Sequence, residues 1–330
     1  MKILSYIIPL YNSATWLQKC LYSVLNQDIP EEQVEIICVN DGSPDNSADI
    51  AREIAKEHPC IVVLDQENQG PSGARNTGMR YATAKYLCFV DPDDFVEPMV
   101  YGGLVMQMEE QRLDMLRFDY QKVNEQFEVQ LMKKNNLQLD ETPKLMTGIQ
   151  FLSERLGVNC FIWRYIYRRD VIIKNNIWCF VGDYYDDVPW LPLVLMKVTR
   201  LNISKKIVYN YVLHQNSLVN NQSLKHIEKK IEGNYVLLKL LKKELNNIKL
   251  DSVKKWYLQM ISLSVVSLLT LIGVNHYDEK AYYLNRLNEM FLFPLSVCNV
   301  TNKITFKIKL INFSPNLYLW IVNKHSKKLS

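Results

Sequence analysis

Short runs of apolar, often β-branched residues alternate with helical patterns through the first hundred residues of the chain. The strand-like runs cover residues 3–9, 34–39, 61–64 and 86–90, and the helical patterns cover residues 13–25, 46–57 and 71–84. Strands that alternate with helices form a mainly parallel sheet with helices on both faces. The pattern therefore predicts an α/β fold for this part of the chain.

Each of the four predicted strands ends in a polar loop. The loops contain Tyr11 and Asn12, Asp41 to Ser43, Asn68 to Gly70, and Asp91 to Asp94. Open α/β sheets bind ligands at the carboxyl ends of their strands. We therefore expect the four loops to converge on one crevice.

The pattern changes twice further along the chain. Residues 120–145 are polar and indicate a surface hairpin or excursion, an apolar stretch follows at residues 161–173, and residues 206–213 are strand-like again. From Ser223 onward Leu, Lys and Asn recur with helical spacing. We place a domain boundary near residue 220, with an α/β domain over residues 1–220 and a mainly helical region over residues 221–330.

Residues 256–274 contain no charged side chain, and 19 residues are enough to cross a membrane. The same stretch carries a polar stripe that includes Gln259, Ser262 and Thr270. A crossing helix would also place many of the later lysines outside, against the positive-inside rule. A buried helix is the preferred interpretation.

Charge is distributed unevenly. Residues 1–220 carry 22 Lys and Arg against 28 Asp and Glu, and residues 221–330 carry 17 against 7. The basic region is compatible with a solvated helical face, an anionic membrane surface or a nucleic acid. Seven cysteines without a CxxC pair, and an N-terminal apolar run too short for a signal peptide, favour a reduced, cytoplasmic location.

The strongest chemical signal is the group Asp91, Asp93 and Asp94 after a buried strand. Three carboxylates in four residues repel one another unless a cation neutralises them, and oxygen ligands favour Mg²⁺ or Mn²⁺. A solvated acidic helix start is the alternative. Asp41, at the end of a neighbouring strand, favours the metal interpretation because it adds a second carboxylate to the same crevice.

Neither a Walker motif nor GxGxxG occurs in the chain, so a glycine loop does not cradle the phosphates. A cation is then needed for that role. The segment GPSGARN (residues 70–76) begins a predicted helix and brings Arg75 toward a bound nucleotide, although an ordinary loop with an exposed Arg has the same appearance.

The chain contains, in order, IIPLYN (7–12), EIICVNDGSPDNS (35–47), NQGPSGARNTGMRYATAKYLCFVDPDD (68–94), WRYIYRR (163–169) and YYDDVPW (184–190). Over residues 3–218 this series resembles the family 2 glycosyltransferases with the GT-A fold, members of the nucleotide-diphospho-sugar transferase superfamily. The resemblance implies a metal-dependent, inverting transferase. The nucleotide would then be bound by Pro9, Tyr11, Asn12, Asp41, Arg75 and Asp91, and Asp93 would ligate Mn²⁺ or Mg²⁺. Residues 1–110 would form the nucleotide-sugar half and residues 111–220 the acceptor half.

The resemblance also implies that Asp186 and Asp187 represent a pair usually written Glu-Asp, with Asp187 as the catalytic base. Inversion is a single displacement in which one carboxylate takes the proton of the acceptor hydroxyl. Surface acids in a Tyr-rich loop are the alternative. The first acid is shorter here than in the family, and Val212 stands where an Arg often sits.

Further contacts to the acceptor or diphosphate are expected from Asp94, Trp163, Arg164, Asp186, Trp190 and His214. The two Trp residues suit the core equally well, and a lone His is more often structural.

The implied reaction moves a sugar, of hexosyl or N-acetylhexosaminyl type, from a UDP-sugar to a saccharide or lipid-linked saccharide in cell-surface polysaccharide or glycan assembly. Peripheral contact of the C-terminal region with the inner face of the cytoplasmic membrane is expected, and no nucleic acid partner. A non-catalytic carbohydrate- or membrane-binding scaffold and a sugar nucleotidyltransferase are the alternatives. The nucleotidyltransferase would need a Gly-rich basic loop where PLYNSATW stands (residues 9–16).

Overall fold

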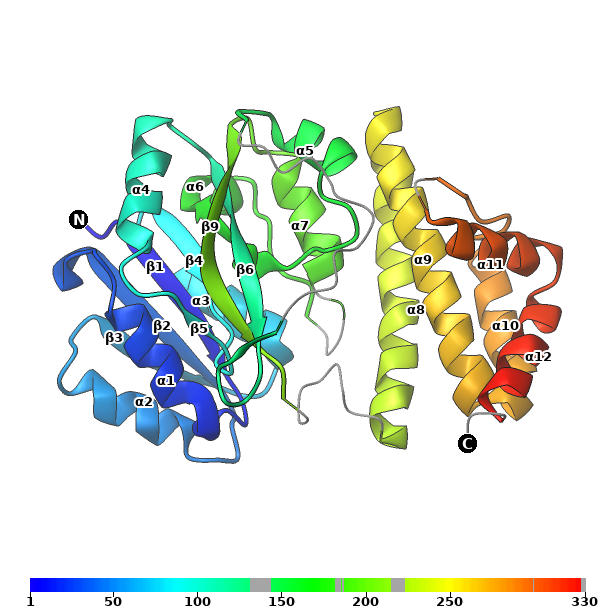
Figure 1. The fold of residues 1–330 in the computed structure, drawn as a ribbon, viewed down its shortest axis with the longest axis horizontal. Helices are drawn as coiled ribbons and strands as arrows, with labels where there is room; N and C mark the ends of the chain where they lie inside the picture. Colours follow the sequence, from blue (N-terminus) through cyan, green and yellow to red (C-terminus); the bar gives the residue numbers. More distant parts are fainter. Residues whose placement is uncertain (131–143, 182–184, 186, 215–222, 299, 328–330) are drawn as a thin grey trace. The chain divides into compact units, whose positions relative to one another are not determined.

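The chain forms two compact units, Met1–Asn220 and Asn221–Ser330. The structure is a computed structural model that describes residues 1–130, 144–181, 185, 187–214, 223–298 and 300–327 (Figure 1).

The first half of the N-terminal unit is the predicted parallel sheet. Its strands are β1 (Leu4–Leu10), β2 (Val34–Asp41), β3 (Ile61–Gln66) and β4 (Tyr86–Phe89), in the spatial order β3-β2-β1-β4. The connecting helices are α1 (Ala14–Leu25), α2 (Ser47–Ala55) and α3 (Gly70–Tyr81). Right-handed crossovers place α1 and α2 on one face and α3 on the other, because the chain reverses direction across the sheet after β3 (Figure 1).

The sheet continues without a break into the second half of this unit. The further elements are η1 (Glu31–Gln33), β5 (Phe95–Val96), α4 (Tyr101–Glu110), β6 (Met115–Val123), β7 (Val129–Gln130), α5 (Gly148–Glu154), η2 (Ile162–Arg164), β8 (Tyr165–Arg168), α6 (Arg169–Ile173), α7 (Asp187–Leu195) and β9 (Leu201–Val212). Among the described residues the order is β3-β2-β1-β4-β8-β6-β9-β5, with β7 paired to β6. Strand β8 is antiparallel to both β4 and β6, whereas β6 and β9 are parallel.

The β6–β7 hairpin lies within the polar stretch for which the sequence predicted a hairpin or excursion, and residues 131–143 lie outside the described residues. The mixed, mainly parallel α/β fold with a helical C-terminal region is confirmed.

Close packing of α3 on the sheet needs a glycine. A Cβ atom built on Gly78 would lie 2.4 Å from Cγ2 of Ile7 in β1. Every residue of β1 is buried, so this contact lies in the centre of the core. Any larger side chain at position 78 would push α3, and with it the loop at its N-terminus, away from the sheet.

A buried carboxylate joins the amino ends of the central strands. Glu35, in β2, accepts hydrogen bonds from the Ser5 hydroxyl (2.6 Å) and from the N–H groups of Thr83 (2.5 Å) and Ala84 (2.9 Å). Burial alone would raise the pKa of Glu35, but these hydrogen bonds outweigh burial and lower it. Glu35 thus connects β1, β2 and the turn between α3 and β4.

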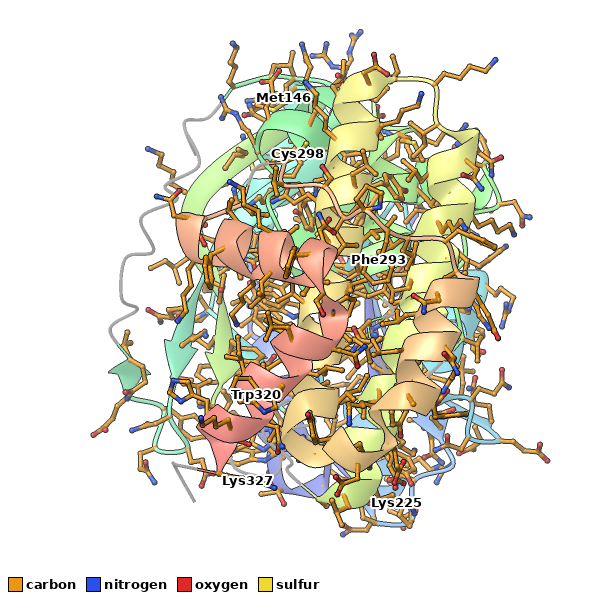
Figure 2. The ribbon with its side chains drawn as sticks, turned by 90° about the vertical axis from the view of Figure 1, so that its right-hand side faces the viewer. Met146, Lys225, Phe293, Cys298, Trp320 and Lys327 are labelled. Atoms are coloured by element: carbon orange, nitrogen blue, oxygen red, sulfur yellow. The ribbon has the colours of Figure 1, made fainter. Side chains whose placement is uncertain are left out.

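The C-terminal unit is helical, as the periodicity from Ser223 predicts. It contains α8 (Leu224–Asn247), α9 (Asp251–Asn275), η3 (Tyr277–Glu279), α10 (Lys280–Glu289), α11 (Asn302–Phe313) and α12 (Pro315–Ser326). The hydroxyl of Tyr235 in α8 donates to the carbonyl of Tyr283 in α10 (2.8 Å), and Arg286 pairs with Glu232 nearby. Figure 2 shows this unit with its side chains.

Helix α9 contains the uncharged stretch 256–274. Among the described residues it is the one helix long and apolar enough to span a membrane, and 67% of its apolar window is buried inside the protein. Polar Gln259, Ser262 and Ser264 are buried with it. This burial agrees with the preferred interpretation of a core helix.

Replacing Glu35 by Gln should lower the free energy of unfolding by about 2 kcal/mol at neutral pH, because the amide loses charge-assisted acceptance from two N–H groups. The native pKa of Glu35 lies below the usual 4.5, so this stabilisation is present above that pH and is lost as pH falls through the native pKa. Urea denaturation at several pH values measures the difference. Glu57→Gln, on the surface, is the control. A difference from wild type that does not shrink in acid would contradict the assignment.

Candidate active site

The loop Asp91–Asp94 is held by a single tyrosine of a distant strand. The hydroxyl of Tyr209, in β9, donates to Oδ2 of Asp94 (2.8 Å) and accepts from the N–H of Asp91 (3.0 Å). Asp94 Oδ1 accepts from the N–H of Val212 (2.8 Å), and the Asp94 side chain is 3% exposed. Burial raises the pKa of Asp94 well above its usual range, and the charges of Asp93 and Asp91 add to this effect. Asp94 therefore ties the loop to β9.

The ring of Tyr209 belongs to an aromatic stack. The centres of the Trp163 and Tyr209 rings lie 4.2 Å apart at an interplanar angle of 13°. The Phe161 ring stacks on Trp163, with the ring centres 5.0 Å apart. Trp163 is 4% exposed and lies in η2, before β8. Trp163 thus supports the loop Asp91–Asp94, called the carboxylate loop below, through Tyr209. The sequence was compatible with a core position for Trp163 and with an acceptor contact, and the structure places it in the core.

The ends of β2 and β4 carry the carboxylates predicted for nucleotide binding. Asp41, 2% exposed at the end of β2, accepts from the Gln66 side chain (2.7 Å) and from the N–H of Gln69 (2.8 Å) with its Oδ1. Arg75, in the first turns of α3, pairs with Asp91 at 2.7 Å. Asp41 is therefore positioned by the end of β3 and the loop that follows it, and Asp91 by α3 itself.

Gly42 permits the turn that follows Asp41. Its φ is +64°, and a Cβ atom there would lie 3.3 Å from the N atom of Asn68. A side chain would both strain the backbone and separate the β2 loop from the β3 loop.

The loops after β1 and β2 are joined by Asp45. Its carboxylate accepts from the hydroxyls of Ser43 (2.6 Å) and Ser47 and from the N–H of Ala14 (2.9 Å). Burial raises the pKa of Asp45, but these hydrogen bonds lower it to about 2. Asn12, in the left-handed region at φ +50°, donates its N–H to the Ser43 hydroxyl (2.9 Å). No feature of the sequence other than the polar run NDGSPDNS indicated this link.

The first predicted nucleotide contacts lie in this joined region. The Tyr11 side chain is 49% exposed, whereas Pro9 is buried in β1 beyond the last residue that pairs with β4. Pro9 lacks an N–H group, so this position near the strand end is one that it tolerates.

Asp93 and His214 meet at the exposed edge of the loop. Nε2 of His214 lies 2.8 Å from Oδ2 of Asp93, and the hydrogen bond with Asp93 raises the pKa of His214. The His214 ring also lies 5.8 Å from that of Trp16 in α1. A carboxylate oxygen and an imidazole nitrogen are both metal-ligand atoms. Among the residues that the structure describes, no group of three His, Cys, Asp and Glu side chains is arranged to hold a metal.

Asp187 is the first residue of α7. The neighbouring strand β8 contributes Tyr167, whose buried hydroxyl donates to the carbonyl of Ile162 (2.7 Å). Burial raises the pKa of Tyr167 well above its usual value, with smaller contributions from Tyr165, Cys179 and Asp187, and Arg75 opposes the rise.

Asn76 fixes the segment that leads to this acid. Its amide donates to the carbonyl of Cys179 (2.9 Å) and accepts from the Cys179 N–H (2.8 Å). Sequence reasoning missed this contact, although Asn76 directly follows Arg75 in the GARN segment. The pair holds Cys179 beside α3. Asp186 lies outside the described residues.

Two other predicted contacts are enclosed. Trp190 is fully buried, with its ring near those of Phe89 and Tyr167. The guanidinium of Arg164 donates to Asp119 at 2.8 Å and lies 4.7 Å from the Tyr120 ring centre, and burial lowers its pKa. Trp190 therefore occupies the core, and Arg164 takes part in a buried ion pair.

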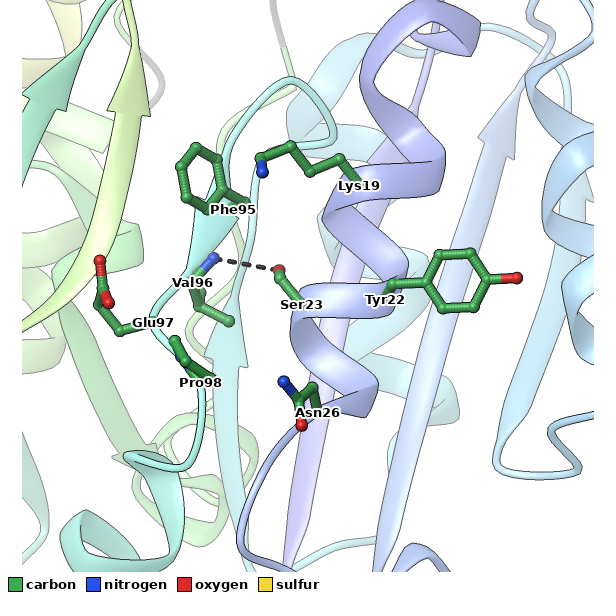
Figure 3. Close-up of a pocket in the computed structure, with 8 residues that line it drawn as sticks. All are labelled: Lys19, Tyr22, Ser23, Asn26, Phe95, Val96, Glu97 and Pro98. Atoms are coloured by element: carbon green, nitrogen blue, oxygen red, sulfur yellow. Dashed lines mark hydrogen bonds between the residues drawn. The ribbon is translucent and has the colours of Figure 1, made fainter. Parts of the chain in front are cut away.

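A shallow groove of about 310 Å³ lies between α1 and β5 (Figure 3). Lys19, Tyr22, Asn26, Phe95 and Glu97 are among its lining residues, and Ser23 accepts from the N–H of Val96 (3.1 Å). The ammonium of Lys19 lies over Phe95 (4.2 Å) and Phe127 (3.9 Å). Asp41, Asp91 and Asp187 do not line this groove.

Changing Tyr209 to Phe should lower the free energy of unfolding by about 2 kcal/mol, because Asp94 and the Asp91 N–H each lose a buried partner. Faster hydrogen exchange at the Asp91 amide should accompany the loss. Tyr211→Phe is the matched control. Tyr211 lies on β9 like Tyr209, and its ring stacks on Trp163 with the ring centres 6.0 Å apart. Equal effects of the two changes on stability and exchange would show that the Tyr209 hydroxyl does not hold the loop.

The chain has sequence relatives among bacterial glycosyltransferases. The chain is 33% identical over 261 residues to an uncharacterized glycosyltransferase, YibD, of Escherichia coli (strain K12), which covers 76% of this chain and 73% of the relative. A poly(ribitol-phosphate) beta-glucosyltransferase of Bacillus spizizenii is 42% identical over 98 residues, or 29% of this chain and 15% of the relative.

The fold is shared with a solved protein. The crystal structure of Staphylococcus aureus TarS 1-349 in complex with UDP-GlcNAc superposes with a TM-score of 0.74 at 18% identity, over 99% of this chain and 92% of that one. Residues 5–174 match the family described as "Glycosyl transferase family 2". The match includes strands β1 to β8, the carboxylate loop and Arg75, and together with the relative from E. coli it shows that this chain belongs to the family 2 glycosyltransferases.

Proposed function

We propose that this glycosyltransferase moves a sugar from a UDP-sugar to an acceptor hydroxyl with inversion, and that Asp187 is its base. The proposal rests on the Arg75–Asp91 pair and on the contact of Asn76, which follows Arg75 in α3, with Cys179, eight residues before Asp187. A base opposite the nucleotide is what a single displacement requires.

The nucleotide half of the proposal involves residues 1–110. Asp41 and Tyr11 would hold the base, with Pro9 and Asn12 shaping the loop, and Arg75 and Asp91 would lie beside the ribose and diphosphate. The support is that Asp41 and Asp91 follow two strands of the parallel sheet that are separated only by β1, and that Asp41 is held by the loop before α3 and Asp91 by Arg75 of α3. That the bound structure of TarS contains UDP-GlcNAc favours a UDP-sugar.

A divalent cation, Mn²⁺ or Mg²⁺, would be held by Asp93, with His214 as a second ligand. The fit rests on the donor atoms, because Oδ2 of Asp93 and Nε2 of His214 already approach to 2.8 Å at the rim of the site. The side chain of Asp93 is 36% exposed, which leaves it accessible to a diphosphate. When bound, the cation would offset the negative charge that develops on the leaving diphosphate.

The acceptor half involves residues 111–220. Asp187 would accept the proton of the attacking hydroxyl, and the Asn76–Cys179 contact would keep the segment before α7 beside Arg75. Asp186 is proposed to orient the acceptor. Arg164, Trp163, Trp190 and Asp94 would act on the acceptor indirectly, through the buried contacts that support the sheet and the carboxylate loop.

The acceptor is proposed to be a saccharide or lipid-linked saccharide of a cell-surface polysaccharide, and the sugar a hexose or N-acetylhexosamine. The similarity to a poly(ribitol-phosphate) beta-glucosyltransferase favours this class. We place the enzyme in the cytoplasm at the inner face of the membrane, with the C-terminal unit in peripheral contact. The basic charge of residues 221–330 supports that location.

Asp187→Asn should lower the rate of sugar transfer by about 100- to 10,000-fold, since the amide cannot take the hydroxyl proton. Release of UDP from UDP-sugars in the presence of cell-wall saccharides measures turnover. Titration calorimetry should show UDP affinity within about twofold of wild type, because Asp187 lies opposite the nucleotide. Asp49→Asn, on the exposed side of α2, is the control. Full activity in the Asp187 variant would exclude it as the base.

Thermal denaturation with UDP-, GDP- and dTDP-sugars should show stabilisation by the uridine compound, increased by Mn²⁺ or Mg²⁺. At a ligand concentration of about 100 times Kd the expected gain is about 2.7 kcal/mol. Asp93→Asn should remove the increase due to the metal and leave that due to the nucleotide. Stabilisation by a guanosine compound alone, or an unchanged metal effect in the variant, would contradict these assignments.

A further inference from the structure

The end of the chain is basic without any compensating acid. Residues 290–330 contain six lysines and neither Asp nor Glu, and the whole unit 221–330 carries 17 basic against 7 acidic residues. Helices α11 and α12 occupy most of this stretch. Their charge alone is compatible with a solvated surface. The exposure of their apolar side chains therefore decides between a solvated surface and a binding surface.

Helix α11 exposes two aromatic rings on one face. Phe306 is 68% exposed and Phe313 is 82% exposed, and they lie seven residues apart, which is two helical turns. Lys303 and Lys309 are exposed on the same side. The opposite face is fully buried at Ile308 and Ile311. This helix therefore has a second apolar stripe that the fold does not use.

Helix α12 has the same organisation. Leu317 (37% exposed), Trp320 (48%) and Lys324 follow a helical spacing, and Ile321 (38%) borders them. The ammonium of Lys324 lies 4.9 Å from the Trp320 ring. Tyr318 and Leu319, on the other face, are at most 2% exposed.

Both helices pack against α9 with their buried faces. The Thr270 hydroxyl lies 2.8 Å from that of Tyr318, and a Cβ atom on Gly273 would lie 2.8 Å from Cγ1 of Val322. Helix α11 contacts both α9 and α12. Figure 2 shows α11 and α12 on the same side of the helical unit, with Trp320 and Lys327 labelled on the second helix. Their exposed stripes therefore point away from α9 and lie on one side of the unit.

We propose that this lysine–aromatic surface binds the headgroup region of an anionic phospholipid bilayer. It is formed by Lys303, Phe306, Lys309, Phe313, Leu317, Trp320, Ile321 and Lys324. Aromatic and aliphatic side chains enter the interface while lysines reach the anionic headgroups. The proposal specifies the lipid chemistry and the residues of the membrane contact proposed above, and it does not depend on sugar transfer.

Charge favours lipid over the other occupants of an apolar surface. A second copy of the chain would bring the same lysines against these lysines, and no Asp or Glu of residues 290–330 would offset them. Nucleic acid would leave the aliphatic side chains of Leu317 and Ile321 without apolar partners. An anionic bilayer satisfies both the charge and the apolar atoms.

Flotation of the full chain with vesicles tests the surface. Wild type should bind vesicles that contain phosphatidylglycerol in phosphatidylcholine and should bind much less to phosphatidylcholine alone. Phe313→Ser with Trp320→Ser should lower the partition coefficient by about tenfold or more. The triple change of Lys303, Lys309 and Lys324 to Gln should lower it by about a hundredfold at low salt.

Matched control variants distinguish an effect of this surface from a general effect of net charge or of any exposed aromatic ring. Gln at Lys243, Lys249 and Lys255 makes the same charge change on α8, the connection after it and α9, and Tyr81→Ser removes an aromatic ring that is 45% exposed on α3. Both controls should bind as wild type does. If the control triple loses as much binding as the surface triple, net charge and not this surface is responsible, and the proposal is wrong.

Tryptophan fluorescence gives a positive measurement. Trp320 is the most exposed of the six tryptophans, so bromine-labelled phosphatidylglycerol should quench part of the fluorescence, and Trp320→Phe should abolish that quenching while flotation persists. Asp187→Asn should bind vesicles as wild type does, which separates this proposal from the catalytic one. The proposal would be overturned if Trp320 were not quenched in protein that floats with vesicles. It would also be overturned if the chain did not bind vesicles and instead formed a dimer that the Phe313 and Trp320 changes abolish.

Discussion

The hydroxyl of Tyr209 holds the carboxylate loop of this enzyme to a strand more than a hundred residues away. It donates to Asp94 and accepts from the Asp91 N–H, so the backbone and the innermost acid of the loop are fixed together. Asp94 is buried and its pKa is raised, whereas Asp91 pairs with Arg75 and Asp93 with His214. The aromatic stack from Phe161 through Trp163 holds the tyrosine ring in turn.

The same principle organises the rest of the site, where buried or partly buried polar side chains join separate segments through hydrogen bonds. Asp45 joins the loops after β1 and β2, and Asn76 joins α3 to the segment before α7. Each accepts or donates at least two hydrogen bonds within the N-terminal unit. The acids proposed for nucleotide, metal and proton transfer are thereby positioned by groups that do not themselves need to touch substrate.

In the helical unit some apolar side chains are buried between helices and others are exposed to solvent. Helix α9 is uncharged from residue 256 to residue 274 and largely buried, and it forms the centre against which the other helices pack. Helices α11 and α12 bury one stripe on it and expose another beside lysines. Hydropathy alone draws attention to α9, yet α11 and α12 expose aromatic rings beside lysines. Length and composition therefore do not show which helix is buried in the core, whereas the tertiary structure does.

The sequence by itself determined the first four strands, their helices, the polar loops at the strand ends and the family, because local periodicity and short motifs carry that information. It also indicated the helical nature of residues 221–330. Only the tertiary structure decided the partners of the acids: that Asp94 faces Tyr209, that Asp93 meets His214, that Trp190 lies in the core and that Arg164 pairs with Asp119. These contacts join residues 45 to 121 positions apart, and no local pattern encodes which distant side chain will fill a given space.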